Sequence, residues 1–211
     1  MKLLVVAAWE PELERFRELA REPLIPHIAA GVGIGLVDAA IGTARLLAKH
    51  APESVLLLGT CGAAPGSSLA IGDVVVARSV LLVDPATLEG RAALPWSPAP
   101  IEGMLVAPFV AAGAIATSIA TTLGITTDDA LAATLAREAE TEHLEAYAVA
   151  RACALAGIPC IVVLGITNII GSRGRAEWRA NHVEVSATVA RLAVKALASP
   201  PFTSLLHPSS V

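Results

Sequence analysis

The chain has 211 residues, of which 55% are hydrophobic and 16% are charged. This composition argues against a disordered chain, and the length is enough for one domain with a buried core. The formal net charge is -4 and the sequence has no basic cluster, so nucleic acid is not expected as a partner. We expect one domain over residues 1–200 and a loose tail over residues 201–211.

Apolar runs alternate with helical patterns along the chain. In chain order, the sequence predicts a strand at residues 2–8, a helix at 11–21, a glycine-rich segment at 28–35, a helix at 36–49, strands at 55–58 and 73–83, a long surface connection with some strand at 85–108, a strand at 114–118, helices at 128–137 and 145–156, a strand at 160–166 and a helix at 177–198. One apolar face of the helix at 36–49 is expected to point inward: Val37, Ile41, Ala44, Leu47 and Ala48. The alternation predicts an α/β fold with a largely parallel core.

The cysteines and the charge-free stretches bear on the compartment. Cys61, Cys153 and Cys160 form no CxxC pair and no spacing typical of a metal site, so no metal is expected. The odd cysteine count, without a secretory signal, predicts reduced thiols in a cytoplasmic protein. Residues 104–127 and 152–172 carry no charge, but Pro and Gly interrupt both, so we expect buried elements and no membrane span.

Two carboxylates, Glu10 and Glu12, lie where the first strand meets its helix. At this position both can simply complement the positive end of the helix dipole. Alternatively, Glu12 is desolvated in a cleft at the strand end, takes a raised pKa and activates a water molecule as a general base. The residues alone leave both interpretations open.

Two glycine-containing segments are candidates for holding ligand oxygen atoms. The first is centred on Gly33; it lacks the Lys-Ser/Thr ending of a P-loop, and a tight turn into a closely packed helix is an equal alternative. The second, Gly59-Thr60-Cys61-Gly62, is expected to turn after a buried strand and aim N–H groups and a hydroxyl at a ligand. Alternatively, its small residues serve close packing at a strand end. Nothing near Cys61 in the sequence makes it a nucleophile.

Polar side chains also follow the later predicted elements. Glu145 begins an apolar helix, where an unpaired buried carboxylate is costly, and a sugar diol is a suitable partner. Its neighbours Glu142 and His143 are expected to be solvated or structural. Asn168 ends a strand, where its amide suits either the edge of a heterocycle or a turn.

These segments together resemble the nucleoside phosphorylase/uridine phosphorylase superfamily, in its hydrolase branch. The matching motifs run through the chain in order: Ala8-Trp9-Glu10-Pro11-Glu12, Gly33-Ile34-Gly35-Leu36-Val37, Gly59-Thr60-Cys61-Gly62, Ile71-Gly72-Asp73-Val74-Val75-Val76, Glu142-His143-Leu144-Glu145-Ala146 and Leu164-Gly165-Ile166-Thr167-Asn168. The resemblance implies a three-layer sandwich, in which helices flank a twisted, mixed and largely parallel central sheet. It also implies a homodimer and no cofactor.

The resemblance assigns roles to individual residues. It implies that Glu12 orients the attacking water, and that Asn168 assists protonation of the purine leaving group at N7. The remaining assignments are Glu145 and Leu144 for the ribose, Thr122, Leu123, Cys61 and Gly62 for the base, and Thr60 and Gly33 for the water or phosphate region.

Differences within the family point to one activity. The chain has no Gly-Asp-Pro phosphate loop, and Gly72 takes the position of an Arg, so water is expected to replace phosphate as the nucleophile. Asn168 suits a 6-oxopurine, and the run from Asn168 to Arg173 with Trp178 resembles futalosine hydrolases, which release hypoxanthine from futalosine in a menaquinone pathway.

Two arginines follow this strand, and each has two possible roles. Arg173 or Arg175 would bind the substrate carboxylate, or either one is ordinary surface charge. The alternatives for the activity are a methylthioadenosine/S-adenosylhomocysteine nucleosidase, a phosphate-dependent purine nucleoside phosphorylase and a non-catalytic nucleoside-binding protein.

Overall fold

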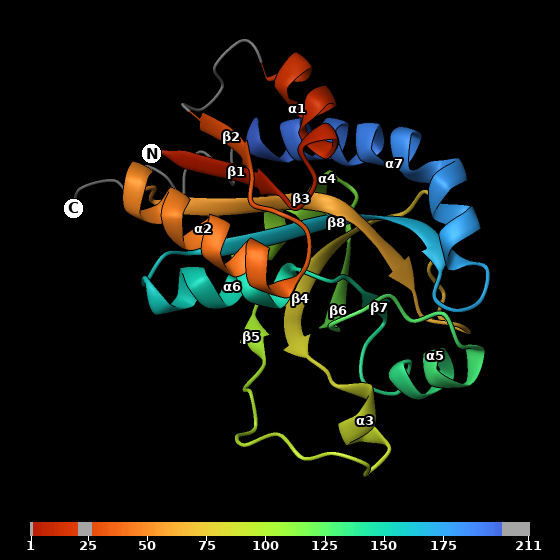
Figure 1. The fold of residues 1–211 in the computed structure, drawn as a ribbon. Helices are drawn as coiled ribbons and strands as arrows, with labels where there is room; N and C mark the ends of the chain where they lie inside the picture. Colours follow the sequence, from red (N-terminus) through yellow and green to blue (C-terminus); the bar gives the residue numbers. More distant parts are fainter. Residues whose placement is uncertain (1, 21–26, 200–211) are drawn as a thin grey trace.

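The computed structural model describes residues 2–20 and 27–199, and its strands form one sheet with helices on both sides (Figure 1). The strands are β1 (Leu3–Ala7), β2 (His27–Gly31), β3 (Ser54–Ala63), β4 (Val74–Leu82), β5 (Ile101–Glu102), β6 (Ile115–Thr121), β7 (Thr141–Glu142) and β8 (Cys160–Ile169). The helices are the 3-10 turn η1 (Glu10–Leu13), α1 (Glu14–Leu19), α2 (Leu36–His50), α3 (Pro85–Leu88), α4 (Val106–Ala112), α5 (Asp129–Leu135), α6 (Ala146–Leu155) and α7 (Gly174–Leu197). The predicted α/β fold is confirmed.

The sheet is mixed, and most of its pairings are parallel. β3 pairs in parallel with β1 and β8, and β1 pairs in parallel with β2. β8 is antiparallel to β4, while β6 is parallel to both β4 and β7. Because β7 also pairs with the end of β3, at Gly62 opposite Glu142, the strands β3, β8, β4, β6 and β7 close into a ring.

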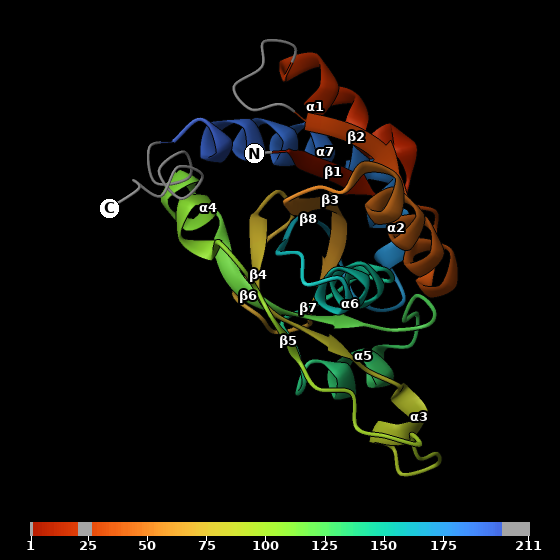
Figure 2. The ribbon, with the colours of Figure 1, turned by 90° about the vertical axis from the view of Figure 1, so that its left-hand side faces the viewer.

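Helices cover both faces of the sheet (Figure 2). Alternate residues of β1 point to opposite faces: Leu3 and Val5 pack in a core with α1, α4 and α7, whereas Leu4 and Val6 pack in a core with α2 and α6. Strands buried on both faces read as continuous apolar runs, which is why the sequence located them. The three-layer arrangement that the resemblance implied is confirmed.

Close packing of α7 on β8 depends on Gly165. A Cβ atom at this position would lie 2.2 Å from Cγ1 of Val185 and 2.8 Å from Cγ2 of Val189. The missing side chain lets the helix cross the strand closely, and this places the first turns of α7 beside the carboxyl end of β8.

Three predictions of local structure need correction. β3 continues through Gly59-Thr60-Cys61-Gly62 to Ala63, so this segment is strand and not a turn, with a register shift between Cys61 and Gly62. Residues 27–31 form a strand rather than part of a glycine-rich loop, because they pair with β1. The connection at 85–108 contains the expected strand, β5, but also a short helix, α3, that was not predicted. The predicted tail and the end of the first helix lie outside the described residues.

The predicted inward face of α2 is correct at Leu47 and wrong at Val37, Ile41, Ala44 and Ala48. Its buried residues are Ala39, Thr43 and Leu47, whereas Val37 and Ile41 are 65% and 55% exposed. The helix therefore turns much of its apolar surface away from the sheet. Across residues 2–20 and 27–199, no helix is long and apolar enough to cross a membrane.

Candidate active site

Polar side chains gather at the carboxyl ends of β1, β3 and β8, where open parallel sheets place ligands. The turn η1 follows β1 directly and carries Glu12, whose N–H donates to the carbonyl of Trp9 at 3.0 Å. Pro11 suits this turn because its missing N–H is not needed there. The result is a carboxylate folded back over the end of the sheet.

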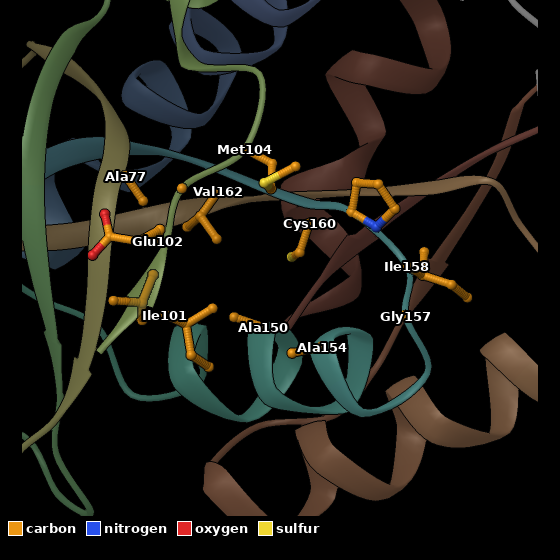
Figure 3. A pocket seen from close by; sticks show the side chains of 13 residues that line it. Ala77, Ile101, Glu102, Met104, Ala150, Ala154, Gly157, Ile158, Cys160 and Val162 are labelled. Atoms are coloured by element: carbon orange, nitrogen blue, oxygen red, sulfur yellow. The ribbon is translucent and has the colours of Figure 1, made fainter. Parts of the chain in front are cut away.

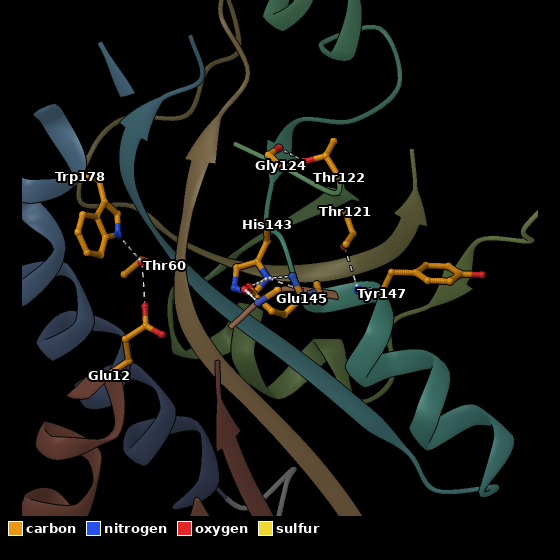
Figure 4. Close-up of polar contacts among 11 residues, drawn as sticks. Glu12, Thr60, Thr121, Thr122, Gly124, His143, Glu145, Tyr147 and Trp178 are labelled. Atoms are coloured by element: carbon orange, nitrogen blue, oxygen red, sulfur yellow. Dashed lines mark hydrogen bonds and ion pairs between the residues drawn. The ribbon is translucent and has the colours of Figure 1, made fainter. Parts of the chain in front are cut away.

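The Glu12 carboxyl group is buried and its pKa is raised to about 7. Burial is the main cause, since it disfavours the charged form, and the nearby Glu145 carboxylate acts in the same direction. The Thr60 hydroxyl opposes them by donating to Glu12 Oε1 at 2.8 Å (Figure 4). A carboxylate of this kind exchanges its proton near neutral pH, as a general base requires.

Glu145 occupies the N-cap position of α6 and is 5% exposed. Its Oε1 accepts the N–H of Gly35 at 2.7 Å. Gly33 and Gly35 both have positive φ angles, of 106° and 87°, which glycine adopts readily. The glycine segment thus turns tightly into α2, as one of the two alternatives predicts, and its Gly35 N–H binds the chain's own Glu145 carboxylate; binding of a ligand oxygen stays a prediction.

His143 is a buried residue that the sequence reasoning placed among solvated or structural side chains. Its Nδ1 accepts N–H groups from Glu145 at 3.2 Å and from Ala146 at 3.0 Å, so it closes the start of α6 (Figure 4). Nδ1 also lies 3.4 Å from Glu145 Oε2. Burial lowers the pKa of His143, and the Glu145 carboxylate opposes that effect.

Oε2 of Glu12 and Nε2 of His143 both approach Gly59, and the Glu145 carboxylate contacts the same imidazole from its Nδ1 side. A Cβ atom on Gly59 would lie 3.3 Å from Nε2 of His143 and 3.4 Å from Oε2 of Glu12. These groups come from η1, from the residues before α6 and from the middle of β3. No local sequence signal marks His143, because its burial depends on the strand that passes beneath it.

The predicted base-binding residues fall into two groups. The Thr122 hydroxyl lies 2.9 Å from the Gly124 carbonyl and 3.0 Å from Oε1 of Glu142, whereas the Leu123 side chain is 79% exposed. Glu142 is therefore structural: it also accepts from Thr126 and so ties the loop after β6 to β7. These hydrogen bonds hold the backbone of the loop in place beside β7.

The second group surrounds Asn168, near the end of β8. Its Oδ1 accepts the Thr167 hydroxyl at 2.9 Å, and its Nδ2 donates to the Ile169 carbonyl at 3.2 Å. Nδ2 would lie 2.9 Å from a Cβ atom on Gly62, so glycine there makes room for the amide. The neighbouring Cys61 is buried and burial raises the pKa of its thiol, so it stays protonated.

The other predicted residues lie at the rim or outside it. Arg173 is exposed and its Nε lies 3.5 Å from Oε1 of Glu177, while Arg175 is exposed on the first turn of α7. Leu144 is half-buried beside Glu145. Within residues 2–20 and 27–199, no group of three or more His, Cys, Asp or Glu side chains could hold a metal ion.

A separate pocket of about 260 Å³ lies between β5 and α6 (Figure 3). Its lining is mainly apolar and includes Val80, Ile101, Met104, Ala150 and Cys160, with Glu102 as its carboxylate. None of the candidate site residues lines it. Its chemistry therefore gives no reason to place a reaction there.

Comparison with known proteins gives the chain its relatives. The family model described as the phosphorylase superfamily matches residues 25–199. Futalosine hydrolase from Thermus thermophilus is 29% identical over 161 residues, which is 70% of this chain and 71% of the relative. A 5'-methylthioadenosine/S-adenosylhomocysteine nucleosidase from Chromohalobacter salexigens is 32% identical over 185 residues, which is 78% of this chain and 76% of the relative.

Solved structures agree on the fold. Futalosine hydrolase of Helicobacter pylori superposes with a TM-score of 0.82 at 20% identity, over 93% of this chain and 97% of that chain. The 5'-methylthioadenosine/S-adenosylhomocysteine nucleosidase from Neisseria meningitidis, in complex with methylthio-immucillin-A, superposes with a TM-score of 0.81 at 21% identity, over 93% and 98% of the two chains.

Proposed function

Because the chain belongs to the phosphorylase superfamily, we propose that it hydrolyses the N-glycosidic bond of a purine nucleoside, with futalosine as the substrate. The curated relatives are nucleosidases, and the chain is an enzyme of the same N-glycosidase class. The observation that carries the proposal is a cluster of two buried carboxylates, Glu12 and Glu145, that lie on either side of the His143 imidazole beside β3. The pKa of Glu12, about 7, suits a group that must take a proton at neutral pH.

In this proposal the two carboxylates have different tasks. Glu145 accepts hydrogen bonds from the ribose hydroxyls and stabilises the positive charge that develops on the sugar. Glu12 takes a proton from water while the water oxygen bonds to C1′ and the bond from C1′ to the purine nitrogen breaks. The purine leaves with the bonding electron pair and takes a proton from solvent water at N7, where Oδ1 of Asn168 accepts the new N7–H.

The hydrogen bonds of Thr60 support water rather than phosphate as the nucleophile. A hydroxyl has one hydrogen, and that of Thr60 is directed at Glu12 while its oxygen accepts the indole N–H of Trp178 at 3.2 Å. Donating to a phosphate oxygen would require Thr60 to give up its bond to Glu12. A buried carboxylate next to a phosphate anion would also be repelled.

Asn168 supports a 6-oxopurine as the base. Its bonds to Thr167 and Ile169 use one lone pair of Oδ1 and one hydrogen of Nδ2, which leaves one acceptor and one donor for a ligand. In the departing 6-oxopurine, an amide can accept from N7–H and donate to O6. A departing 6-aminopurine presents two donors, N7–H and the 6-amino group, so the alternative, a 5'-methylthioadenosine/S-adenosylhomocysteine nucleosidase, fits Asp better than Asn.

The test is base release in phosphate-free buffer. The purified chain is incubated with futalosine, inosine or methylthioadenosine, and the free base is followed by chromatography. Hypoxanthine from futalosine alone is the expected result. Adenine from methylthioadenosine would keep the mechanism and overturn the role given to Asn168. Release that needs added phosphate would identify a phosphorylase, and binding without release would identify a non-catalytic protein.

Glu12→Gln separates catalysis from binding in the same assay. The variant is expected to lose most turnover and to keep nucleoside affinity, because the amide preserves the shape of the side chain and removes the base. Retained turnover would exclude the proposed role. Glu14→Gln changes an exposed carboxyl group two residues further along and is the matched control.

We also propose that the chain forms a homodimer through the apolar face that α2 and α6 share. An apolar groove of about 990 Å³ runs along these two helices and is lined by Val37, Ile41 and Leu155, among others. Val37, Ile41 and Leu155 are each more than half exposed, and burial against a second copy would remove this apolar surface from water. Ile41→Glu is expected to yield a monomer in light scattering, whereas Val183→Glu, on the exposed surface of α7, is expected to leave the dimer intact.

A further inference from the structure

Three side chains from three elements form a continuous hydrogen-bonded chain that ends on Glu12. The indole Nε1–H of Trp178, on α7, donates to Oγ1 of Thr60, on β3, at 3.2 Å. The Thr60 hydroxyl donates in turn to Oε1 of Glu12, on η1, at 2.8 Å (Figure 4). Trp178 and Thr60 are separated by 118 positions in the sequence, so only the fold brings them together.

The donor and acceptor roles in these two hydrogen bonds follow from the groups at either end, the Trp178 indole and the Glu12 carboxylate. An indole N–H can only donate, and an ionised carboxylate can only accept. Trp178 therefore occupies a lone pair of Thr60 and leaves the hydroxyl hydrogen for Glu12. The arrangement favours the carboxylate form of Glu12, which burial otherwise disfavours.

Aromatic packing holds the indole in place. The Trp178 ring stacks on His182, with ring centroids 4.3 Å apart and an angle of 13° between the planes. Trp9, three residues before Glu12, contacts the same indole with centroids 5.9 Å apart. The donor is thus anchored both by α7 and by the residue that leads into η1.

We propose that Trp178 and Thr60 are positioning residues that hold Oε1 of Glu12, so that Oε2 is the oxygen presented to the attacking water. Oε2 is the atom that lies over Gly59, on the side where Nε2 of His143 approaches. This inference rests on the proposed function, because it takes Glu12 as the base. It assigns Trp178 a task that a phenylalanine could not perform.

Other groups near Glu12 also affect its ionisation. The Glu145 carboxylate raises the pKa of Glu12, and the buried Cys61 thiol stays protonated. His143, between Glu145 and Gly59, has a pKa lowered mainly by burial. Thr60 is therefore the hydrogen-bonding side chain that favours ionisation of Glu12 in this cluster, through the bond that Trp178 orients.

The first experiment needs no activity. Each of the three tryptophans gives one indole N–H signal in a ¹⁵N-labelled NMR spectrum, and Trp178→Phe identifies the signal of Trp178. That signal is expected to shift with a midpoint near pH 7 and to stop shifting in Glu12→Gln. Both proteins are therefore compared in a His182→Phe background, which removes the imidazole stacked on the indole. In that background, a signal that does not respond to pH, or that still responds in Glu12→Gln, would overturn the inference.

The second experiment follows kcat/KM against pH. Thr60→Val is expected to move the acid limb upward by about one pH unit, which is a tenfold loss below that limb, because a hydrogen bond to the charged form is removed. Thr60→Ser should restore the limb, and Trp178→Phe should move it in the same direction by less. Trp96→Phe, at an exposed indole far from Glu12 in the sequence, is the control.

The two experiments distinguish a failure of the proposed function from a failure of the positioning role. If the wild-type chain releases no base from any nucleoside, the proposed function fails, while the NMR titration still decides whether Trp178 and Glu12 are coupled. If base is released but Thr60→Val and Trp178→Phe leave the pH profile where it was, the positioning role fails and the proposed function stands.

Discussion

Replacing Glu12 with Gln is expected to stabilise the folded chain at alkaline pH. The carboxyl group is buried, and its pKa rises from an ordinary value of 4.5 to about 7 on folding. Holding the ionised form in the folded chain therefore carries a cost. The rise corresponds to about 3 kcal/mol, because each pKa unit is about 1.36 kcal/mol. Gln keeps the size of the side chain and an oxygen that can accept from Thr60.

The sign follows from the protons that each state binds. Below pH 4.5 the carboxyl group is protonated in the folded and the unfolded chain, and no penalty exists. Between pH 4.5 and 7 the unfolded chain loses the proton while the folded chain keeps it, so the free energy of unfolding of the wild type falls as the pH rises. Above pH 7 both states are ionised, and the full loss of about 3 kcal/mol remains.

The assay is urea denaturation of both proteins between pH 5 and pH 9 at constant ionic strength. The difference in free energy of unfolding, variant minus wild type, is expected to grow over this range and to level off above pH 8. Glu14→Gln, at an exposed position of α1, should show no such growth. A difference that stays constant for Glu12→Gln within about 0.5 kcal/mol would refute the argument from burial.

Three further substitutions test other parts of the structure. Glu145→Gln is expected to raise the KM for the nucleoside about tenfold or more in base-release assays, because a charged acceptor for the ribose hydroxyls is lost. Gly42→Ala should lower the free energy of unfolding in urea by about 2 kcal/mol, since its Cβ would lie 1.9 Å from the Val32 carbonyl oxygen. Asp128→Ala should cost about 1 kcal/mol in thermal melts, because Asp128 caps α5 through the N–H of Leu131 at 2.7 Å.

The strands that the sequence located well are those buried on both faces. β1 and the first parts of β4 and β8 consist mainly of Val, Leu and Ile, and their positions follow from composition alone. Of the strands that were missed, β7 has only two residues, and β2 is His-Ile-Ala-Ala-Gly, in which Ile28 alone has a strong preference for a sheet. It is a strand because the edge of β1 offers it hydrogen-bond partners, which no local pattern can reveal.

The extension of β3 was missed for a related reason. Gly59 and Gly62 read locally as turn residues. In the fold, the segment between them pairs with β8 and its end pairs with β7, and these partners override the local preference. Both glycines are needed for a different purpose, since Cβ atoms there would crowd His143 and Asn168. Gly59 and Gly62 therefore mark positions where other side chains approach the strand closely, and not a turn.

In the candidate site, too, local sequence predicts some residues but not the contacts among them. Glu12, Glu145 and Asn168 could be proposed from the sequence because each follows or precedes a predicted element, and such positions converge in an α/β fold. The contacts among them could not be proposed, because they depend on register between distant strands. His143 and the bond from Trp178 to Thr60 belong to this second kind, and so does the raised pKa of Glu12, which has burial as its main cause.

The apolar residues of α2 that do not face the sheet indicate how this helix is covered. A helical period of apolar residues indicates that one face avoids water, but it does not say which surface covers that face. In α2 the sheet takes Ala39 and Leu47, and the more hydrophobic Val37 and Ile41 remain open beside α6. A pattern this regular, left uncovered by its own chain, is what a helix shows when a second molecule completes its burial. The oligomeric state of Ile41→Glu is therefore the measurement that decides whether the sequence was misread or described the assembly.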